Sequence, residues 1–394
     1  MDLALSPEDS DFRDILREFL LDKIPPEIAE KGRRNIPFSP ADSMACQAIL
    51  GKNGYGAMNW PSEYGGGDAT PLHQYIFTNE LIAANWPRQS PYGLRMIGPI
   101  IMKYGTNEQK MRYLPGIIHG KDWWTQGFSE TGAGSDLTSL KTRAVLKGDN
   151  YLLNGHKIWT STAHEANLMF ALVRTADEGR PQEGITFLII PMDLPGITVQ
   201  PIIGIDLAHS LNQVFFDDVL VPASGRIGDE NSGWSYAKFL LINERVGIAD
   251  IQRTRKRILQ LRKLSSVEKT PTGPLIADQV FSSKLADVEG DLLLLEYSMI
   301  RLLDPSRYGS KLPNALGLKI RGSEIGQRVT ELAVEALGPT ALPYEPNNWE
   351  LDELPSDREL TRGVMQTYLH YRAASIYGGT TEVLKNMMAK QLLG

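Results

Sequence analysis

The 394-residue sequence is poor in the groups that build metal centres and covalent cross-links. Cys46 is its single cysteine, and its six histidines show no ligand spacing such as H-E-x-x-H. One cysteine excludes an internal disulfide and a thiolate metal site formed by this chain alone. The G-x-S-x-G nucleophile elbow is absent as well. We therefore expect no metal ion.

Long apolar runs and a basic surface are also missing. No apolar run approaches the ~18 residues of a membrane span, so we expect no membrane segment. The net charge is -6 and the pI about 5.7, whereas nucleic-acid binding needs a basic footprint. The first residues include acids where a signal peptide has a basic region and an apolar core. These absences predict a cytoplasmic protein that binds no nucleic acid.

The remaining composition is that of a globular protein, with 42% hydrophobic and 22% charged residues. The length suggests two or three domains. A capping serine, Ser6, precedes a proline and two acids and predicts a first helix. We predict an α+β multidomain fold with three parts: a helical N-terminal domain (1–124), a middle β-domain (125–235) and a helical C-terminal domain (236–394).

The middle region contains several short strand patterns without helices between them, which predicts a compact antiparallel barrel or sandwich. Asn154-Gly155 is a strong hairpin signal, so we expect a turn there between two strands. Further strands are expected at 184–191, 197–202 and 214–221.

A glycine-rich stretch at 127–136, GFSETGAGSD, is the first candidate for chemistry. Glycines with hydroxyls and exposed amides can hold a phosphate or a polar ring. A dinucleotide fingerprint would need a helix after the glycines, but strands follow here, so that interpretation is weak. A plain surface turn is the alternative, although the stretch is long and chemically dense for a turn.

Trp159-Thr160-Ser161 at the end of an expected strand is the second candidate. A tryptophan offers a flat face, and the serine beside it offers a hydrogen-bond donor. If the tryptophan stood alone, a half-buried structural role would be the better interpretation.

The third candidate is the segment 240–251, where Leu240, Glu244, Ile248 and Ile251 share one face of an expected helix. Glu244 then lies in an apolar stripe, where burial raises the pKa of a carboxyl group. Such a carboxylate suits a general base. The pattern alone supports equally a buried glutamate paired with Arg245 or another arginine.

Taken together, three motifs resemble those of the acyl-CoA dehydrogenase family of flavoenzymes: FSETGAGSDL at 128–137, NGHKIWTS at 154–161 and SIYGGTTEVLKN at 375–386. The resemblance covers the whole chain and implies an N-terminal helical domain, a β-barrel and a C-terminal four-helix bundle with FAD as cofactor. It implies that a glutamate removes the α-proton of an acyl-CoA thioester while a hydride leaves the β-carbon for the flavin. The electrons then pass to an electron-transfer flavoprotein.

The same resemblance assigns residues by position in these motifs. Residues expected to line or flank the flavin ring are Gln126, Phe128, Ser129, Trp159, Thr160 and Ser161. Gly134 and Ser135 are expected near the pyrophosphate and the substrate, and Thr380 and Glu382 near the nucleotide half of FAD. Tyr377, Gly378 and Gly379 are expected at the substrate, where a backbone N–H donates to the thioester carbonyl.

One departure from the family pattern concerns the base. In the commonest branch the base follows the tyrosine of the C-terminal motif, but Gly378 occupies that position and has no side chain to act. Other branches, which resemble isovaleryl- and long-chain-acyl-CoA dehydrogenases, have the glutamate just before an arginine on the first bundle helix. Glu244-Arg245 matches that pattern, which makes Glu244 the favoured catalytic base and Arg245 a substrate residue.

A second departure concerns the subunit interface. Homotetrameric members supply an arginine and a glutamine–glycine segment to a neighbour's FAD, and both motifs are degraded here, at 268–273 and 335–341. Losing a cation opposite a pyrophosphate is costly, so we expect a homologous second chain in an α2β2 assembly, with a homo-oligomer as the alternative. Within the family the sequence resembles the large subunit of pimeloyl-CoA dehydrogenase and heteromeric steroid-side-chain acyl-CoA dehydrogenases.

These departures favour an acyl-CoA dehydrogenase of fatty-acid or steroid catabolism acting on a bulky, cyclic, dicarboxylic or steroid-derived thioester. Two alternatives stay open. The chain is an oxidase-type or monooxygenase flavoenzyme of the same fold that uses oxygen, or it is a non-catalytic assembly subunit of a heteromeric dehydrogenase.

Overall fold

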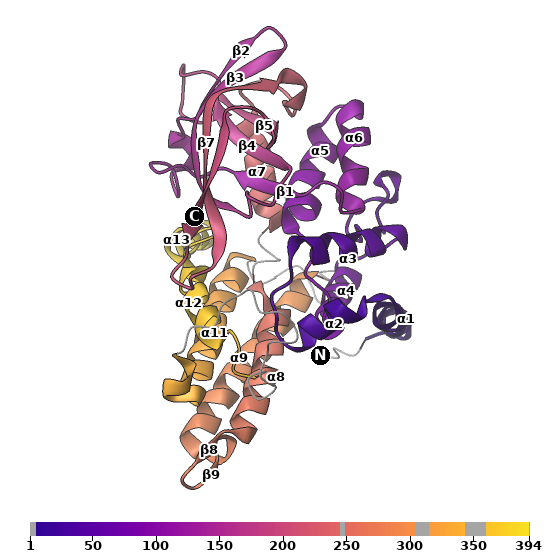
Figure 1. The fold of residues 1–394 in the computed structure, drawn as a ribbon, viewed down its shortest axis with the longest axis vertical. Coiled ribbons are helices and arrows are strands. Elements are labelled where there is room, and N and C mark those ends of the chain that lie inside the picture. The colour runs from indigo at the N-terminus through magenta and orange to yellow at the C-terminus, as the bar shows by residue number, and fades with distance from the viewer. Residues whose placement is uncertain (1–4, 245–248, 304–314, 343–359, 394) are drawn as a thin grey trace. The chain divides into compact units, whose positions relative to one another are not determined.

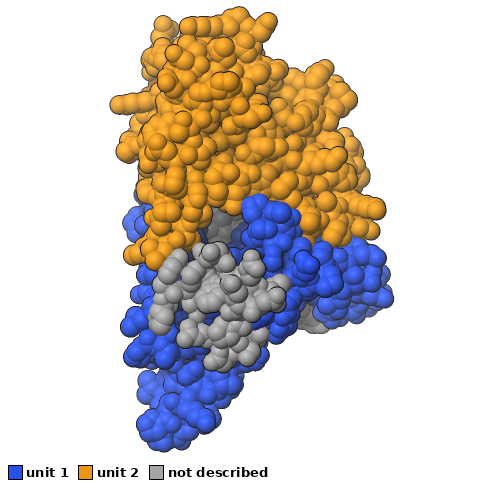
Figure 2. Space-filling model, in the orientation of Figure 1, with its two compact units in different colours: residues 1–42, 69–88, 245–394 blue, residues 43–68, 89–244 orange. Residues whose placement is uncertain are grey.

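A computed structural model describes residues 5–244, 249–303, 315–342 and 360–393, with the side chains of 241–244 excluded. The chain forms two compact units, which Figure 2 colours separately. Unit 1 contains residues 1–42, 69–88 and 245–394, and unit 2 contains 43–68 and 89–244. Each unit is built from segments that are distant in sequence.

Unit 2 combines helices with a mixed sheet (Figure 1). The helix α3 (Pro40–Lys52) begins in unit 1 and ends in unit 2. The other helical elements of unit 2 are η1 (Ser62–Tyr64), the π-helix η2 (Tyr92–Ile97), α5 (Gly98–Tyr104), α6 (Asn107–Ile118), η3 (Leu137–Ser139), η4 (Ala223–Gly225) and α7 (Gly233–Glu244).

The sheet of unit 2 has seven strands: β1 (Trp124–Gly127), β2 (Arg143–Lys147), β3 (Asn150–Ser161), β4 (Leu168–Arg174), β5 (Ile185–Pro191), β6 (Ile197–Ile203) and β7 (His209–Pro222). Its order is β1-β4-β2-β3-β7-β6, and β5 pairs with β4. Most pairs are antiparallel, as expected, but β4 runs parallel to both β1 and β2. The strands predicted at 184–191, 197–202 and 214–221 are confirmed.

The predicted hairpin turn at Asn154-Gly155 is wrong, because β3 continues through both residues. The turn lies earlier, at Gly148, whose φ is 60°. Asn154 instead exchanges two hydrogen bonds of 2.9 Å with Asp218 of β7, at a register shift between the strands. Gly155 allows a close approach, since a Cβ there would lie 2.7 Å from the Cα of Thr142. The dipeptide therefore accommodates a bulge.

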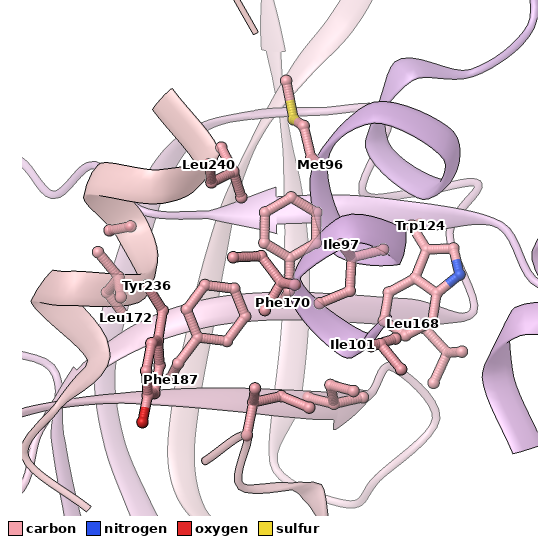
Figure 3. Packing of buried hydrophobic residues seen from close by; sticks show 14 of the residues in the cluster. Met96, Ile97, Ile101, Trp124, Leu168, Phe170, Leu172, Phe187, Tyr236 and Leu240 are labelled. Carbon is pink, nitrogen blue, oxygen red and sulfur yellow. The ribbon is translucent and has the colours of Figure 1, made fainter. Parts of the chain in front are cut away.

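The central strand β4 is buried on both faces and divides its side chains between two hydrophobic clusters. Phe170 and its alternate neighbours join a core with Phe187 and residues of α5, α6 and α7 (Figure 3). Met169 and Ala171 join a second core between the strands themselves. A short strand buried on both faces gives a continuous apolar run instead of alternation.

Unit 1 is helical. Its elements are α1 (Pro7–Lys23), α2 (Pro26–Arg33), α4 (Pro71–Ala83), α8 (Ile251–Val267), η6 (Leu275–Ala277), α9 (Gln279–Leu303), α11 (Ala315–Leu337), η7 (Gly338–Ala341), α12 (Val364–Tyr371), η10 (Arg372–Ser375) and α13 (Thr381–Leu393), with a small hairpin of β8 (Lys269–Thr270) and β9 (Gly273–Pro274). The predicted first helix is confirmed, since Ser6 and Asp9 form a capping box at its start. Buried side chains of α8, α9 and α11 form the main core.

The single helix predicted over 240–251 is interrupted. α7 ends at Glu244, and Asp250 has a left-handed φ of 47° immediately before α8. Leu240 and Ile251 therefore belong to different helices, and the face expected to contain both does not exist. The predicted order of helical, strand and helical regions is confirmed. Within the described residues, no helix is long and apolar enough to cross a membrane.

Candidate active site

A bulge in β3 turns one tryptophan out of the sheet. Between the pairs Lys157–Val214 and Thr160–Asn212, β3 has one residue more than β7. Bulges bend a strand and redirect a side chain. Trp159 in this bulge has a φ of 59° and is 57% exposed. A positive φ is a real outlier for a bulky residue, and such strain is typical of functional sites.

The hydroxyl group of Thr160, next to this tryptophan, is buried and has no hydrogen-bond partner in the described part of the chain. Two backbone carbonyls beside it do have partners. The Thr160 carbonyl accepts from the Asn212 side-chain amide at 3.0 Å, and the Ser161 carbonyl accepts from the Thr125 hydroxyl at 2.7 Å. A buried hydroxyl without a partner costs roughly 1–3 kcal/mol, a cost that a hydrogen bond to a bound group would remove.

The glycine-rich loop contains two glycines that no described neighbour requires. Among the described residues, a Cβ at Gly132 or Gly134 would meet nothing within 4 Å, and neither glycine has a positive φ. Ser135 beside them is exposed. Glycine is otherwise kept where a backbone conformation or a close contact demands it. Close approach of a bound group from outside the chain explains both positions.

The loop is fixed to β3 by a buried ion pair. The Lys157 ammonium, 0% exposed, donates to the Glu130 carboxylate at 2.7 Å and to the Phe128 carbonyl at 3.1 Å. The Glu130 carboxylate also accepts from the N–H groups of Lys141 at 2.6 Å and Thr142 at 2.9 Å. One buried pair therefore ties both ends of the loop to the strand.

The pKa values of Lys157 and Glu130 are both lower than usual, for different reasons. Burial lowers the pKa of Lys157 to about 8, although its contact with Glu130 acts in the opposite direction. Burial alone raises the pKa of Glu130, but the Lys157 charge and the hydrogen bonds hold it below its usual range. The motif analysis missed both residues as functional candidates. Strand alternation offered the signal, since Tyr151, Leu153 and Lys157 share the inward parity of β3.

The predicted flavin-lining residues before the loop have different environments. Gln126 is half-buried on β1, where it pairs with Phe170 of β4. The Phe128 ring is buried edge-on against Phe170, with 5.7 Å between ring centroids, so this side chain belongs to the core. The Ser129 carbonyl accepts from the N–H of Ile158 at 2.9 Å. That bond joins the loop directly to the bulge.

In unit 1 the C-terminal motif forms a tight turn with two consecutive glycines. Gly378 and Gly379 have φ values of 64° and 90°, and Tyr377 before them is 46% exposed. No acceptor for the N–H groups of the two glycines lies in the described part of the chain. Positive φ at both positions explains why glycine occupies them.

The two nucleotide-side candidates lie at the start of α13. The Thr380 hydroxyl accepts from the N–H of Val383 at 3.2 Å and so caps this helix. Glu382 is exposed in the first turn of the helix, where a negative charge is favourable. Both residues thus have a structural role within the chain.

The predicted base can be located only by its backbone. Glu244 is the last residue of α7, and its side chain lies outside the described residues, as does all of Arg245. Unit 2 therefore brings together Gln126, Phe128, Ser129, Gly134, Ser135 and the Trp159–Ser161 segment. Unit 1 contains the contiguous group from Tyr377 to Glu382.

A charged cluster that the motifs did not indicate lies at the start of α8. The Tyr371 hydroxyl donates to the Asp250 carboxylate at 2.6 Å, and Arg257 and Arg253 lie within 3.8 and 4.0 Å of it. Burial alone raises the pKa of Asp250, but the arginines Arg253, Arg88 and Arg257 hold it below its usual range. The cluster fixes the left-handed residue that precedes α8.

The residues of unit 2 fit a bound flavin. An exposed tryptophan face, an unpaired buried hydroxyl and two glycines open to the outside are the groups that a flat polar ring with a phosphate tail requires. Among the described residues, no group of three or more His, Cys, Asp or Glu side chains could hold a metal ion.

Three family models match the chain. They are the N-terminal domain of acyl-CoA dehydrogenase over residues 6–121, the middle domain over 125–219 and the C-terminal domain over 231–393. The acyl-CoA dehydrogenase IpdE1 of Mycobacterium tuberculosis is 30% identical over 393 residues, which covers 98% of this chain and 97% of that protein.

Solved structures agree with these matches. The ChsE4-ChsE5 complex from Mycobacterium tuberculosis has a TM-score of 0.83 and 29% identity, covering 100% of this chain and 99% of the matched one. The Tcur3481-Tcur3483 steroid ACAD has a TM-score of 0.82 and 28% identity, with 100% and 99% covered. The predicted fold class and the predicted cofactor, FAD, are confirmed. The chain belongs to the acyl-CoA dehydrogenase family, whose members are FAD-dependent oxidoreductases that act on CH–CH bonds.

Proposed function

We propose that this chain oxidises a bulky, dicarboxylic or steroid-derived acyl-CoA thioester to its 2-enoyl-CoA. The observation that supports a working flavin site best is the β3 bulge, with Trp159 at a φ of 59° and the unpaired Thr160 hydroxyl beside it. Relatives named for steroid substrates support the choice of acyl group.

In this proposal the residues of unit 2 receive the flavin. Trp159 flanks the ring, while Thr160 and Ser161 hydrogen-bond its polar edge. Gln126, Phe128 and Ser129 line the ring, with Phe128 contributing its backbone because its side chain is in the core. Gly134 and Ser135 approach the pyrophosphate and the substrate, and Thr380 and Glu382 approach the nucleotide half.

The proton-transfer role goes to Glu244. Gly378 has no side chain and a φ of 64°, a backbone angle that a glutamate would adopt only with strain. The Glu244 carboxylate takes the α-proton, and Arg245 and Tyr377 contact the substrate. The N–H groups of Gly378 and Gly379 donate to the thioester oxygen, where negative charge develops as the α-proton leaves. When bound, FAD supplies the acceptor for the β-hydrogen and its electron pair.

A homologous second subunit completes the proposal. The 335–341 segment begins with Glu335, whose carboxylate accepts from Lys284 at 2.7 Å and so has a partner in its own chain. The region expected to supply an arginine forms the β8–β9 hairpin without one. Two matched structures are described as two-component proteins, which supports an α2β2 assembly here. An electron-transfer flavoprotein is the proposed acceptor.

The test is a panel of acyl-CoA thioesters assayed with an artificial electron acceptor, with and without co-expressed homologous chains. We expect reduction of the acceptor with bulky thioesters and fuller FAD occupancy in the presence of a partner. Full FAD content and activity of the chain alone would overturn the heteromeric assembly. The domain limits 1–124, 125–235 and 236–394 and the cytoplasmic location stay predictions.

The two alternatives separate in the same assay. Rapid oxygen consumption without added acceptor would support the oxidase-type enzyme. If an assembly with Glu244→Gln in this chain keeps wild-type turnover, Glu244 is not the base. That result would support a non-catalytic role for this chain in the assembly.

A further inference from the structure

Lys319 on α11 is buried beneath the C-terminal motif. The side chain is 0% exposed, and its ammonium donates to the carbonyls of Ala374 and Gly379, each at 2.9 Å. Ser323, one turn further along α11, donates its hydroxyl to the same Ala374 carbonyl at 3.0 Å. Two side chains of one helix thus bind the two ends of the segment that contains Tyr377 and Gly378.

The environment of this lysine is unusual for a buried charge. In the described part of the chain it forms no salt bridge with a carboxylate, whereas buried charges are normally paired. Burial lowers its pKa, and the charge of Glu382 opposes that change in part. The hydrogen bonds to its two acceptors explain why a lysine is buried here despite this cost. The acceptors are the carbonyls on either side of the turn.

The turn between those carbonyls is otherwise weakly held. The N–H groups of Ile376 and Tyr377 both donate to the Ala373 carbonyl, at 2.9 and 3.1 Å. The next two residues, Gly378 and Gly379, donate to no acceptor among the described residues. Glycines are the most flexible residues of a chain. The bonds from Lys319 therefore restrain a segment that its own hydrogen bonds leave loose.

We propose that Lys319 is a positioning residue that clamps the 374–379 turn and holds the N–H groups of Gly378 and Gly379 in place for the substrate carbonyl. This inference rests on the proposed function, in which those N–H groups bind the thioester. The positive charge behind the turn also favours the negative charge that develops on the thioester oxygen.

The experiment compares Lys319→Met, which keeps the length and volume but removes the ammonium, with Ser323→Ala as matched control. Hydrogen exchange is followed by mass spectrometry on peptides covering 374–380 in the FAD-loaded protein. We expect exchange about tenfold faster in Lys319→Met and a much smaller change in Ser323→Ala, which leaves the Gly379 bond intact. Equal effects of both variants would overturn the assignment to the lysine.

Steady-state kinetics with the best thioester of the panel give the second readout. We expect kcat to fall about a hundredfold in Lys319→Met with KM changed far less, since a displaced donor costs mainly in the transition state. Unchanged exchange and kcat in an active protein would refute the clamp alone. An inactive wild type would refute the proposed function, while the exchange measurement would still test the clamp.

A second variant keeps the proposal testable if the first one does not fold. If Lys319→Met does not fold, Lys319→Gln retains a donor without the charge and is measured in the same way. Failure of both variants to fold would show that Lys319 supports the whole unit and would overturn a role confined to the turn.

Discussion

Lys157 in unit 2 and Lys319 in unit 1 are both fully buried, and each donates to one backbone carbonyl of a signature motif, Phe128 for Lys157 and Gly379 for Lys319. They differ in their second acceptor. Lys157 has the Glu130 carboxylate at 2.7 Å, whereas Lys319 has a second carbonyl. The glycine-rich loop is therefore fixed by a neutralised pair, and the C-terminal turn by a cation that forms no salt bridge with a carboxylate of the described residues. The same residue type gives one motif rigidity and the other rigidity plus a local positive potential.

The comparison also predicts unequal costs of removal. Without Lys157, Glu130 remains buried as an unpaired anion, and breaking a buried pair in this way is severe. Without Lys319, only two carbonyls lose a donor, and a carbonyl is cheaper to leave unsatisfied than a carboxylate.

The largest expected effect is that of Lys157→Met. We expect it to lower the free energy of unfolding of the FAD-loaded protein by about 3 kcal/mol or more, because Glu130 is left buried without its cation. Lys319→Met should cost about 1–2 kcal/mol. Urea denaturation followed by circular dichroism measures both. Equal losses would contradict the distinction between the two lysines.

The matched control removes the anion as well. In the double variant Lys157→Met with Glu130→Gln, no buried charge is left alone, so we expect part of the lost stability to return. A double variant less stable than Lys157→Met would show that the pair acts through something other than charge compensation.

Much of this architecture could be predicted from local patterns. The Ser6 capping signal, the strands at 184–191 and 197–202, and the order of regions were all correct because each depends on neighbouring residues. The alternation of β3 places Lys157 on its inward side, but Lys157 was not among the predicted site residues. The motifs themselves located the loop and the turn.

What could not be predicted depends on residues distant in sequence. Asn154-Gly155 satisfies the rule for a hairpin turn, but the hydrogen bonds with Asp218 and the close approach of Thr142 hold it within β3, opposite an extra residue of β7. Lys319 and its Gly379 acceptor are 60 residues apart, so no local pattern could join them.

The next prediction separates a structural glycine from a ligand-facing one. Gly155→Ala should cost about 2 kcal/mol of stability, since its Cβ would lie 2.7 Å from Thr142 and its φ is 144°. Gly134→Ala meets nothing within 4 Å and should leave the stability of the FAD-free protein unchanged while weakening FAD binding. Thermal unfolding and flavin fluorescence titration give the two readouts. Wild-type FAD affinity in Gly134→Ala would remove that glycine from the flavin site.

A smaller effect concerns pH. The folded protein releases the Lys157 proton near pH 8, and the unfolded chain keeps it up to about pH 10.4. The unfolded state therefore binds more protons across this window, and the Lys157 contribution to the free energy of unfolding rises with pH. We expect the stability difference between wild type and Lys157→Met to widen from pH 8 to 10. Burial also lowers the pKa of Lys319, so the corresponding difference for Lys319→Met should move the same way. Parallel curves would contradict a depressed pKa.

The smallest expected effect compares one hydroxyl in each unit. The Ser323 hydroxyl donates within its own chain, at 3.0 Å to the Ala374 carbonyl, while the buried Thr160 hydroxyl has no partner among the described residues. Ser323→Ala should cost about 1 kcal/mol, and Thr160→Val close to nothing or a slight gain, because valine keeps the shape and removes an unsatisfied polar group. With FAD bound the order should reverse, since Thr160→Val then loses a bond that the ligand supplies. Denaturation with and without FAD tests both halves. A Thr160→Val protein that is less stable without FAD and unchanged in FAD affinity would assign this hydroxyl to the chain and remove it from the flavin site.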